Sequence, residues 1–211
     1  MNQSKSSPRI LLIDIETFPN QGFTWGKYEQ TVIKFVKETC IATFAYKWLG
    51  EGRAVSRSLP DYRGYKPESY NDRALVKDLH KLLDEADICI AHNGDKFDFR
   101  VMNSRFLVHG MCPPSPYKTV DTKKVAKKHF RFNSNKLDDI GQLLEEGRKI
   151  KTDFELWEGC IKGDPKAWGR MCRYNEKDVT LLERVYLRLR PYASPHPNLA
   201  AWADGDRCPR C

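Results

Sequence analysis

The segment Leu11–Phe18, with the sequence LLIDIETF, constrains the fold of this chain more than any other. Its apolar residues predict a buried first strand from Ile10 to Ile15, and a near-continuous apolar run is typical of a central strand covered on both faces. Asp14 and Glu16 stand two positions apart, so a strand places both carboxylates on one face. Two like charges on a buried strand are costly unless something neutralises them. The segment therefore predicts a divalent-metal site, the alternative being an edge strand whose charges face solvent.

Length and charge narrow the class of protein. The chain has 211 residues and 40% apolar residues, which fits one globular α/β domain, alone or with a short appendage. No stretch is long and apolar enough to span a membrane, so we expect no membrane partner. Residues 1–8 lack the apolar core of a secretion signal and predict a flexible leader and a cytoplasmic protein, or one in the host cytoplasm if the source is viral. The net charge of +8 indicates either that the protein binds a polyanion such as nucleic acid or that it has a solvated basic surface without a partner.

The order of the predicted elements indicates an α/β fold with a mixed β-sheet flanked by α-helices. Strands come first, alternation of strand and helix follows, and helices fill the last third. We expect a globular domain over residues 9–192 and a tail over residues 193–211. The expected elements after the first strand are two or three antiparallel strands between Phe23 and Val55, a helix over 71–86, a strand over 88–91, a helix over 97–110, an edge strand at Val120, a helix over 122–130, a helix whose Leu137, Ile140, Leu143 and Leu144 share a face, and a helix over 165–190 with a break near Arg173.

Two further carboxylates are candidates to complete the site. Asp98 follows the predicted strand 88–91, and the loop after a strand is where α/β sheets build sites. Asp178 lies on the last helix, on the same face as Tyr174 four residues before it. Four converging carboxylates offer hard oxygen ligands that suit two Mg²⁺ or Mn²⁺ ions. The alternatives are that Asp98 only stabilises a helix N-terminus, that Tyr174 is a core aromatic, and that Asp178 forms a surface ion pair.

These residues resemble the motifs of a known family. Asp14-Ile15-Glu16, Asn93–Asp98 and Tyr174–Asp178 are similar to the first, second and third motifs of the DEDD superfamily of 3′→5′ exonucleases, which has a ribonuclease H-like fold. Tyr174 matches the tyrosine form of the third motif, the DEDDy subclass. The histidine subclass carries His five residues before the last Asp, where this chain has Arg173. The resemblance covers residues 9–190.

The resemblance implies an activity and a set of roles. The implied reaction is two-metal hydrolysis of the terminal phosphodiester of single-stranded nucleic acid with a free 3′ end, DNA in preference to RNA, which releases nucleoside 5′-monophosphates. It implies that Asp14 contacts both metals, that Glu16 and Asp178 complete the first metal site, that Asp98 holds the second metal, and that Tyr174 orients the attacking water. Thr17, Phe18 and Asn93 are expected around the terminal nucleotide. The alternatives are a catalytically inactive nucleic-acid-binding module and a structure-specific endonuclease on the same fold.

A basic segment offers a surface for the substrate. Lys123, Lys124, Lys127 and Lys128 pair at i, i+4 spacing, so a helix collects them on one positive stripe. Such a stripe binds phosphates with a salt-dependent affinity, the alternative being that the lysines only keep the surface solvated. The neighbouring Phe130 and Phe132 either stack on bases or belong to the core.

The cysteines predict reduced thiols and one incomplete metal motif. Five of the seven are scattered singly, as is common in a cytosolic protein. The last two, Cys208 and Cys211, form a Cys-Pro-x-Cys sequence that resembles one half of a zinc ribbon, which needs two halves. We expect a tail without Zn²⁺. The alternatives are a truncated ribbon, zinc shared with another copy of the chain, and a site in which His196 is a third ligand.

Overall fold

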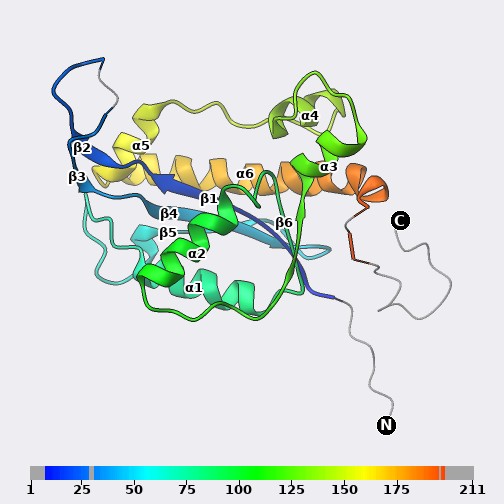
Figure 1. Ribbon diagram of the computed structural model, residues 1–211, viewed down its shortest axis with the longest axis horizontal. Coiled ribbons are helices and arrows are strands. Elements are labelled where there is room, and N and C mark those ends of the chain that lie inside the picture. Colours follow the sequence, from blue (N-terminus) through cyan, green and yellow to red (C-terminus); the bar gives the residue numbers. More distant parts are fainter. Residues whose placement is uncertain (1–7, 29–30, 195, 198–211) are drawn as a thin grey trace, which may run out of the picture.

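The computed structural model describes residues 8–28, 31–194 and 196–197; Cys208 and Cys211 lie outside these residues. A five-stranded sheet with the order β5-β4-β1-β6-β7 forms the centre of the domain (Figure 1). Its strands are β1 (Ile10–Phe18), β4 (Cys40–Trp48), β5 (Val55–Ser58), β6 (Ile88–Ala91) and β7 (Lys118–Asp121).

The sheet is mixed, as the order of elements predicted. β1 pairs antiparallel with β4 and parallel with β6, and it lies at the centre of the sheet. The predicted strand Ile88–Ala91 is confirmed, and Val120 lies in β7 at the edge of the sheet. β1 runs three residues further than the predicted end at Ile15, because its last residues continue the antiparallel ladder with β4 as far as Phe18, opposite Cys40.

The unequal lengths of β1 and β6 create the position of the site. Leu12 pairs with Ile90, and β6 ends at the next residue, Ala91. β1 continues to Phe18 without a partner on that side. The loop after β6 therefore comes level with Asp14 and the residues that follow it.

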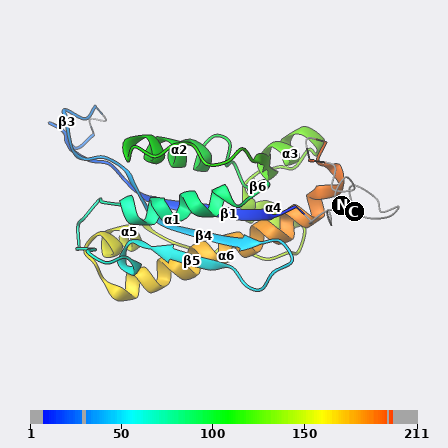
Figure 2. The same ribbon diagram turned by 90° about the horizontal axis from the view of Figure 1, so that it is seen from below.

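Helices cover both faces of the sheet. The helices α1 (Arg73–Asp84) and α2 (Asp98–Val108) cover one face, and α3 (Thr122–His129), α4 (Leu137–Leu143) and α6 (Pro165–Leu189) cover the other. In Figure 2, α2 and α6 lie on opposite sides of β1. The short helix α5 (Phe154–Ile161) packs against α6, and two 3₁₀ turns span Leu59–Asp61 and Arg190–Tyr192. In the described part of the chain, no helix is both long and apolar enough to cross a membrane.

Side chains of β1 alternate between the two apolar cores. Leu11, Ile13 and Ile15 pack into the core under α1 and α2. Ile10 and Leu12 pack into the core under α3, α4 and α6. Asp14 and Glu16 continue the second series, so strand alternation turns both carboxylates toward α6.

Three details of the helices differ from the sequence prediction. α6 is continuous, so the predicted break near Arg173 is wrong; Asp164 caps its start by accepting a hydrogen bond from the Lys166 amide at 2.9 Å. Leu143 is exposed because α4 has only seven residues and Leu143 is the last of them, turned away from the face of Leu137 and Ile140. α5 was not predicted, because a segment of eight residues with mixed polarity is too short to show a clear helical periodicity.

A separate hairpin extends from the end of β1. Its strands β2 (Gln21–Phe23) and β3 (Lys34–Lys37) pair antiparallel and form a two-stranded sheet of their own. Figures 1 and 2 both show this hairpin projecting from the body of the domain.

Candidate active site

Three carboxylates from β1 and α6 form a compact cluster. Asp14, Glu16 and Asp178 each offer an oxygen, and these oxygens lie within 4.8 Å of one another. Asp178 is fully buried, at 0% exposure, whereas Asp14 and Glu16 are half-buried. α6 crosses the face of β1 toward which both strand carboxylates point, and this crossing brings Asp178 to them.

Asp98 joins this cluster from the start of α2. Its Oδ1 accepts a hydrogen bond from the backbone amide of Ile15 at 3.2 Å, and Ile15 stands between Asp14 and Glu16. β6 pairs with β1 only as far as Leu12, so the sheet offers the Ile15 amide no acceptor on that side. The Asp98 carboxylate accepts this hydrogen bond instead. Asp98 is buried, and its charge is the largest charge contribution to the raised pKa of Asp14.

Lys149 is a positive charge in the cluster that the sequence reasoning missed. Its Nζ lies 2.5 Å from Oδ2 of Asp178 and 3.5 Å from the hydroxyl of Tyr174. It also stands over the Tyr174 ring, 5.4 Å from the centroid. Lys149 belongs to the irregular segment between α4 and α5, where no periodicity marks a residue as inward-facing.

The segment that carries Lys149 is held by Asp138 of α4. Asp138 Oδ1 accepts a hydrogen bond from the Lys149 amide at 2.7 Å, and its Oδ2 accepts one from Gln142 Nε2 at 2.8 Å. Asp138 therefore positions Lys149 through the backbone of that segment.

Asn175 fixes the orientation of Asp14 and was also missed. Its Nδ2 donates to Asp14 Oδ2 at 2.6 Å, and its Oδ1 accepts from the Thr43 hydroxyl at 3.4 Å. Asn175 is buried and directly follows Tyr174. The side chain thus connects the third motif, β4 and the first motif.

Burial and mutual repulsion shift the pKa of every carboxyl in the cluster upward. Burial, followed by the charges of Asp98, Glu16 and Asp178, raises the pKa of Asp14 well above its ordinary value. Burial raises the pKa of Glu16 to about 8 and that of Asp98 to about 6. The pKa of Asp178 is also raised by burial, although Lys149 opposes the shift. Without a cation, the cluster holds more negative charge than its surroundings stabilise.

Lys149 is the nearby group that opposes this excess. Burial disfavours its charged form, but the charges of Asp178 and Asp14 outweigh burial, and the pKa of Lys149 is raised. One lysine faces four carboxyls. Asp178 Oδ1 is buried and has no hydrogen-bond donor within the described residues.

Tyr174 is fixed by α5. Its ring packs edge-to-face against Trp157, with the centroids 6.3 Å apart, and Trp157 Nε1 donates to the carbonyl of Thr17 at 3.1 Å. Burial raises the pKa of the Tyr174 hydroxyl, so the phenol is neutral at physiological pH. The helix that the sequence did not predict thus supports a predicted site residue.

The structure corrects one of the predicted nucleotide contacts. Phe18 is 1% exposed, and its ring packs on Tyr70 and Trp168 at centroid distances of 5.2 and 5.7 Å. Phe18 is therefore a core residue, since the end of β1 is covered by α6. Thr17 is half-buried beside it. An exposed aromatic residue directly precedes Asp98 in the sequence: Phe97, which the sequence reasoning did not single out.

Asn93 lies beside a hollow of about 510 Å³ with a largely basic lining. Its backbone has a φ of 70°, and its amide donates to Asp121 Oδ1 at 2.9 Å. Asp121 also caps α3. The hollow is lined by Asn93, Lys96, Asp121 and the four predicted lysines Lys123, Lys124, Lys127 and Lys128.

Part of this basic surface is already paired. Lys124 forms a salt bridge of 2.7 Å with Asp95, and Lys128 donates to Ser194 Oγ at 2.9 Å. Phe130 and Phe132 stack on each other with centroids 5.0 Å apart, and both pack against the core under α6. This packing favours the core alternative for the two phenylalanines.

Neither described histidine near a predicted motif belongs to the carboxylate cluster. His92 contacts the Thr122 hydroxyl at 2.9 Å and the Asn135 carbonyl at 3.0 Å, and burial lowers its pKa to about 4. His196 contacts the Tyr186 hydroxyl at 2.6 Å and the Pro197 carbonyl at 2.8 Å. The ring nitrogens of both residues are therefore engaged in local hydrogen bonds.

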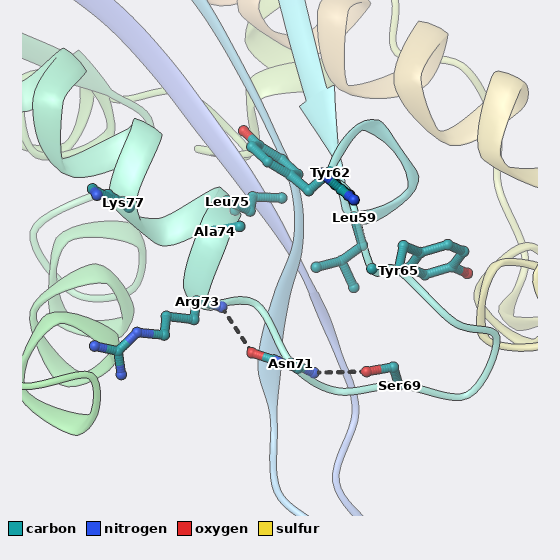
Figure 3. A pocket seen from close by; sticks show the side chains of 11 residues that line it. Leu59, Tyr62, Tyr65, Ser69, Asn71, Arg73, Ala74, Leu75 and Lys77 are labelled. Atoms are coloured by element: carbon teal, nitrogen blue, oxygen red, sulfur yellow. Dashed lines mark hydrogen bonds between the residues drawn. The ribbon is translucent and has the colours of Figure 1, made fainter.

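A second hollow lies away from these residues. Figure 3 shows this hollow of about 300 Å³, which is lined by residues of the Leu59–Asp61 turn, the loop after it and the start of α1. Asn71 Oδ1 accepts a hydrogen bond from the Arg73 backbone amide at 3.2 Å, and the Asn71 backbone amide donates to Ser69 Oγ at 3.3 Å. None of the cluster carboxylates lines this hollow, so it is separate from the candidate active site.

Comparison with known proteins decides the family. The family model described as RNase_H superfamily matches residues 13–190, which is most of the chain and includes all four carboxylates. The chain belongs to the RNase H superfamily. The five-stranded mixed sheet with helices on both faces is the RNase H-like fold.

This RNase H-like chain also resembles a solved polymerase structure. A family B DNA polymerase from the hyperthermophilic archaeon Pyrobaculum calidifontis matches with a TM-score of 0.65 and 16% sequence identity. The match covers 88% of this chain and 25% of the polymerase chain. The chain therefore spans about a quarter of the length of the polymerase, and the likeness is one of fold. The search of curated proteins gave no match.

Proposed function

We propose that this RNase H-like protein is a metal-dependent 3′→5′ exonuclease of the DEDDy type acting on single-stranded nucleic acid. The observation that carries the proposal is the meeting of Asp14, Glu16 and Asp178 within 4.8 Å, with Asp98 bound to the amide between the first two. Tyr174 stands beside this cluster on the same helix as Asp178.

The residues fit divalent cations. Asp178 Oδ1 is buried without a donor in the described structure, the carboxyl pKa values are raised by burial and repulsion, and hard oxygen ligands suit Mg²⁺ or Mn²⁺. Asp14, Glu16, Asp98 and Asp178 would hold two such ions, which when bound supply an activated water and stabilise the charge on the leaving 3′ oxygen.

The remaining residues position the reacting groups. Asn175 binds the Asp14 carboxylate directly, and Asp98 binds the backbone amide of the next residue, Ile15. These two hydrogen bonds hold Asp14 in one orientation. Trp157 and Lys149 hold Tyr174, whose neutral hydroxyl orients the attacking water. Lys149 lies in an ion pair with Asp178, where it offsets part of the negative charge before cations bind.

The substrate is proposed from the surface around the cluster. We assign the exposed ring of Phe97, together with Thr17 and Asn93, to the terminal nucleotide. Lys123, Lys124, Lys127 and Lys128 offer positive charge to phosphates. The shared fold with a DNA polymerase supports DNA as the substrate in preference to RNA. We also propose a cytoplasmic location, because Cys40, Cys89, Cys112, Cys160 and Cys172 are free thiols.

Two single-stranded substrates test the direction and mode of cleavage. A linear strand with a 5′ label should shorten one nucleotide at a time in Mg²⁺ or Mn²⁺ and release nucleoside 5′-monophosphates. A circular strand of the same sequence should remain intact, because an exonuclease needs an end. Cleavage of the circle would show an endonuclease, and binding of both strands without any product would show an inactive binding module.

A further inference from the structure

The described residues of the β2–β3 hairpin, 21–28 and 31–37, expose large apolar side chains. Phe23 is 62% exposed, Trp25 87% and Tyr28 88%. Val32, Ile33, Phe35 and Val36 are exposed on the same hairpin. Single exposed apolar residues are common on protein surfaces, but seven large apolar side chains exposed on one short hairpin point to an interaction site.

The hairpin is built as a projection and contributes little to the domain core. Its two strands pair only with each other, and none of its described residues belongs to either buried apolar core. The two sides of the hairpin approach closely at Gly22, where a Cβ would come within 2.4 Å of Val32 Cγ1 and 2.8 Å of the Lys34 carbonyl. Since a lone two-stranded hairpin is marginally stable in water, these side chains have a use other than stability.

The chemistry of the hairpin matches single-stranded nucleic acid. Lys27 and Lys34 are interleaved with the aromatic residues, and Lys27 Nζ lies 5.8 Å from the centroid of the Tyr28 ring. Lys37 instead donates to the Glu68 carbonyl at 2.9 Å. Aromatic rings that stack on bases, beside cations that bind phosphates, are the features by which proteins hold single strands. A surface for an apolar protein partner would be depleted of lysine.

The hairpin also follows directly from the candidate active site. Gln21, the first residue of β2, is five residues beyond Glu16, and an extended chain of that length spans about 17 Å at most. In Figure 1, the hairpin lies at one end of β1 and α3, with its lysines, lies toward the other. The two basic surfaces therefore do not compete for one stretch of strand.

We propose that the β2–β3 hairpin binds the unpaired bases that precede the terminal nucleotide, through stacking on Trp25, Tyr28 and Phe23. This proposal rests on the proposed function for the direction of the strand. Binding of the bases beyond the terminal nucleotide makes the hairpin a determinant of substrate length: strands that reach it bind more tightly than strands that end at the carboxylates.

Binding measured without cleavage tests the hairpin directly. The probes are labelled single-stranded DNA oligomers of about 4 and about 16 nucleotides, the range of single-strand site sizes, with a chelator present. The double variant Trp25→Ala/Tyr28→Ala should bind the longer oligomer roughly 5- to 150-fold more weakly than the wild type, the loss expected for one base stack or more. The shorter oligomer should bind equally to both. Leu107→Ala, which removes an exposed apolar side chain from α2, is the matched control and should leave both affinities unchanged.

The outcomes separate the hairpin from the enzymatic function. Equal affinity of wild type and double variant for the longer oligomer overturns the hairpin proposal and leaves a protein partner as the occupant. Failure of the wild type to bind either oligomer overturns it as well. If the wild type binds with the expected dependence on Trp25 and Tyr28 but gives no product after Mg²⁺ is added, the hairpin proposal stands and the exonuclease proposal fails.

Discussion

Asp14 is repelled by each of the other three carboxylates of the cluster. It is surrounded by Asp98, Glu16 and Asp178, with Lys149 as the nearby positive charge that acts against them. Neutral Asn at this position keeps the shape of the side chain and removes one of the like charges. We therefore expect Asp14→Asn to abolish cleavage and to stabilise the metal-free protein.

The stability effect of Asp14→Asn is measured by thermal melting in the presence of a chelator. Relief of about 1 kcal/mol of repulsion would raise the Tm of a domain of this size by about 2–4 °C. A lower Tm for the variant would contradict the repulsion that the cluster implies. The same measurement shows that any loss of cleavage is not a loss of folding.

Glu16 and Asp98 make the stability of the metal-free protein depend on pH. The folded state raises the pKa of Glu16 from 4.5 to about 8 and that of Asp98 from 3.8 to about 6. Between these limits the folded state binds more protons than the unfolded state, so the free energy of unfolding falls as pH rises from about 4 to about 8. Melting at a series of pH values with a chelator should show this fall, and Mn²⁺ should restore the Tm most strongly near the upper end. A Tm independent of pH and of Mn²⁺ would contradict the assignment.

Lys149 should affect the metal-free and metal-bound proteins differently. Lys149→Met leaves Asp178 buried without its ion-pair partner, which we expect to cost roughly 1–3 kcal/mol, less than for a fully buried pair because Lys149 is partly exposed. Cations should then stabilise the variant more than they stabilise the wild type. Melting with and without Mg²⁺ measures both effects. Lys151→Met, at an exposed position two residues away, is the control and should change neither.

At the scale of elements, the loop between β6 and α2 determines where Asp98 lies. Gly94 in this loop has no room for a side chain: a Cβ there would come within 2.4 Å of Ala91 Cβ and 2.9 Å of Phe99 Cε2. Gly94→Ala must therefore displace the loop, and we expect a cost of about 1–3 kcal/mol together with reduced cleavage. Gly52→Ala provides the control, because a Cβ at Gly52 meets nothing within 4 Å.

Denaturant unfolding and the 5′-label assay together check the Gly94 prediction. Displacement of the loop should lower activity by more than the loss of folded protein explains, since Asp98 would leave the Ile15 amide. Full activity of Gly94→Ala would show that the position of this loop is not needed.

The elements that carry the motifs could be predicted because their patterns are local. The apolar run of β1, the short buried strand β6 and the Asp164-Pro165 start of α6 each show in a few neighbouring residues. The extension of β1 to Phe18 and the helix α5 depend on pairing with β4 and packing on α6, which no short pattern records. Phe18 was assigned to the substrate for this reason: its position beside the motif was visible, whereas its burial under Trp168 was not.

At the scale of the whole molecule, the convergence of the carboxylates followed from the order of motifs, but the supporting contacts did not. Lys149, Asn175 and Asp138 act across separations of 29, 161 and 11 residues, respectively. Such contacts form only when α4, α6 and the sheet are assembled. The sequence therefore predicted which groups meet, and the structure adds how they are held.

The most direct test of the account compares wild type, Asp178→Asn and the control Glu155→Gln, which removes an exposed charge from α5, on a 5′-labelled linear single strand. The wild type and Glu155→Gln should shorten the strand from its 3′ end with Mg²⁺ or Mn²⁺ and stop when a chelator is added. Asp178→Asn should remain folded and leave the strand intact. Shortening by folded Asp178→Asn at the wild-type rate, or by the wild type with the chelator present, would contradict the account.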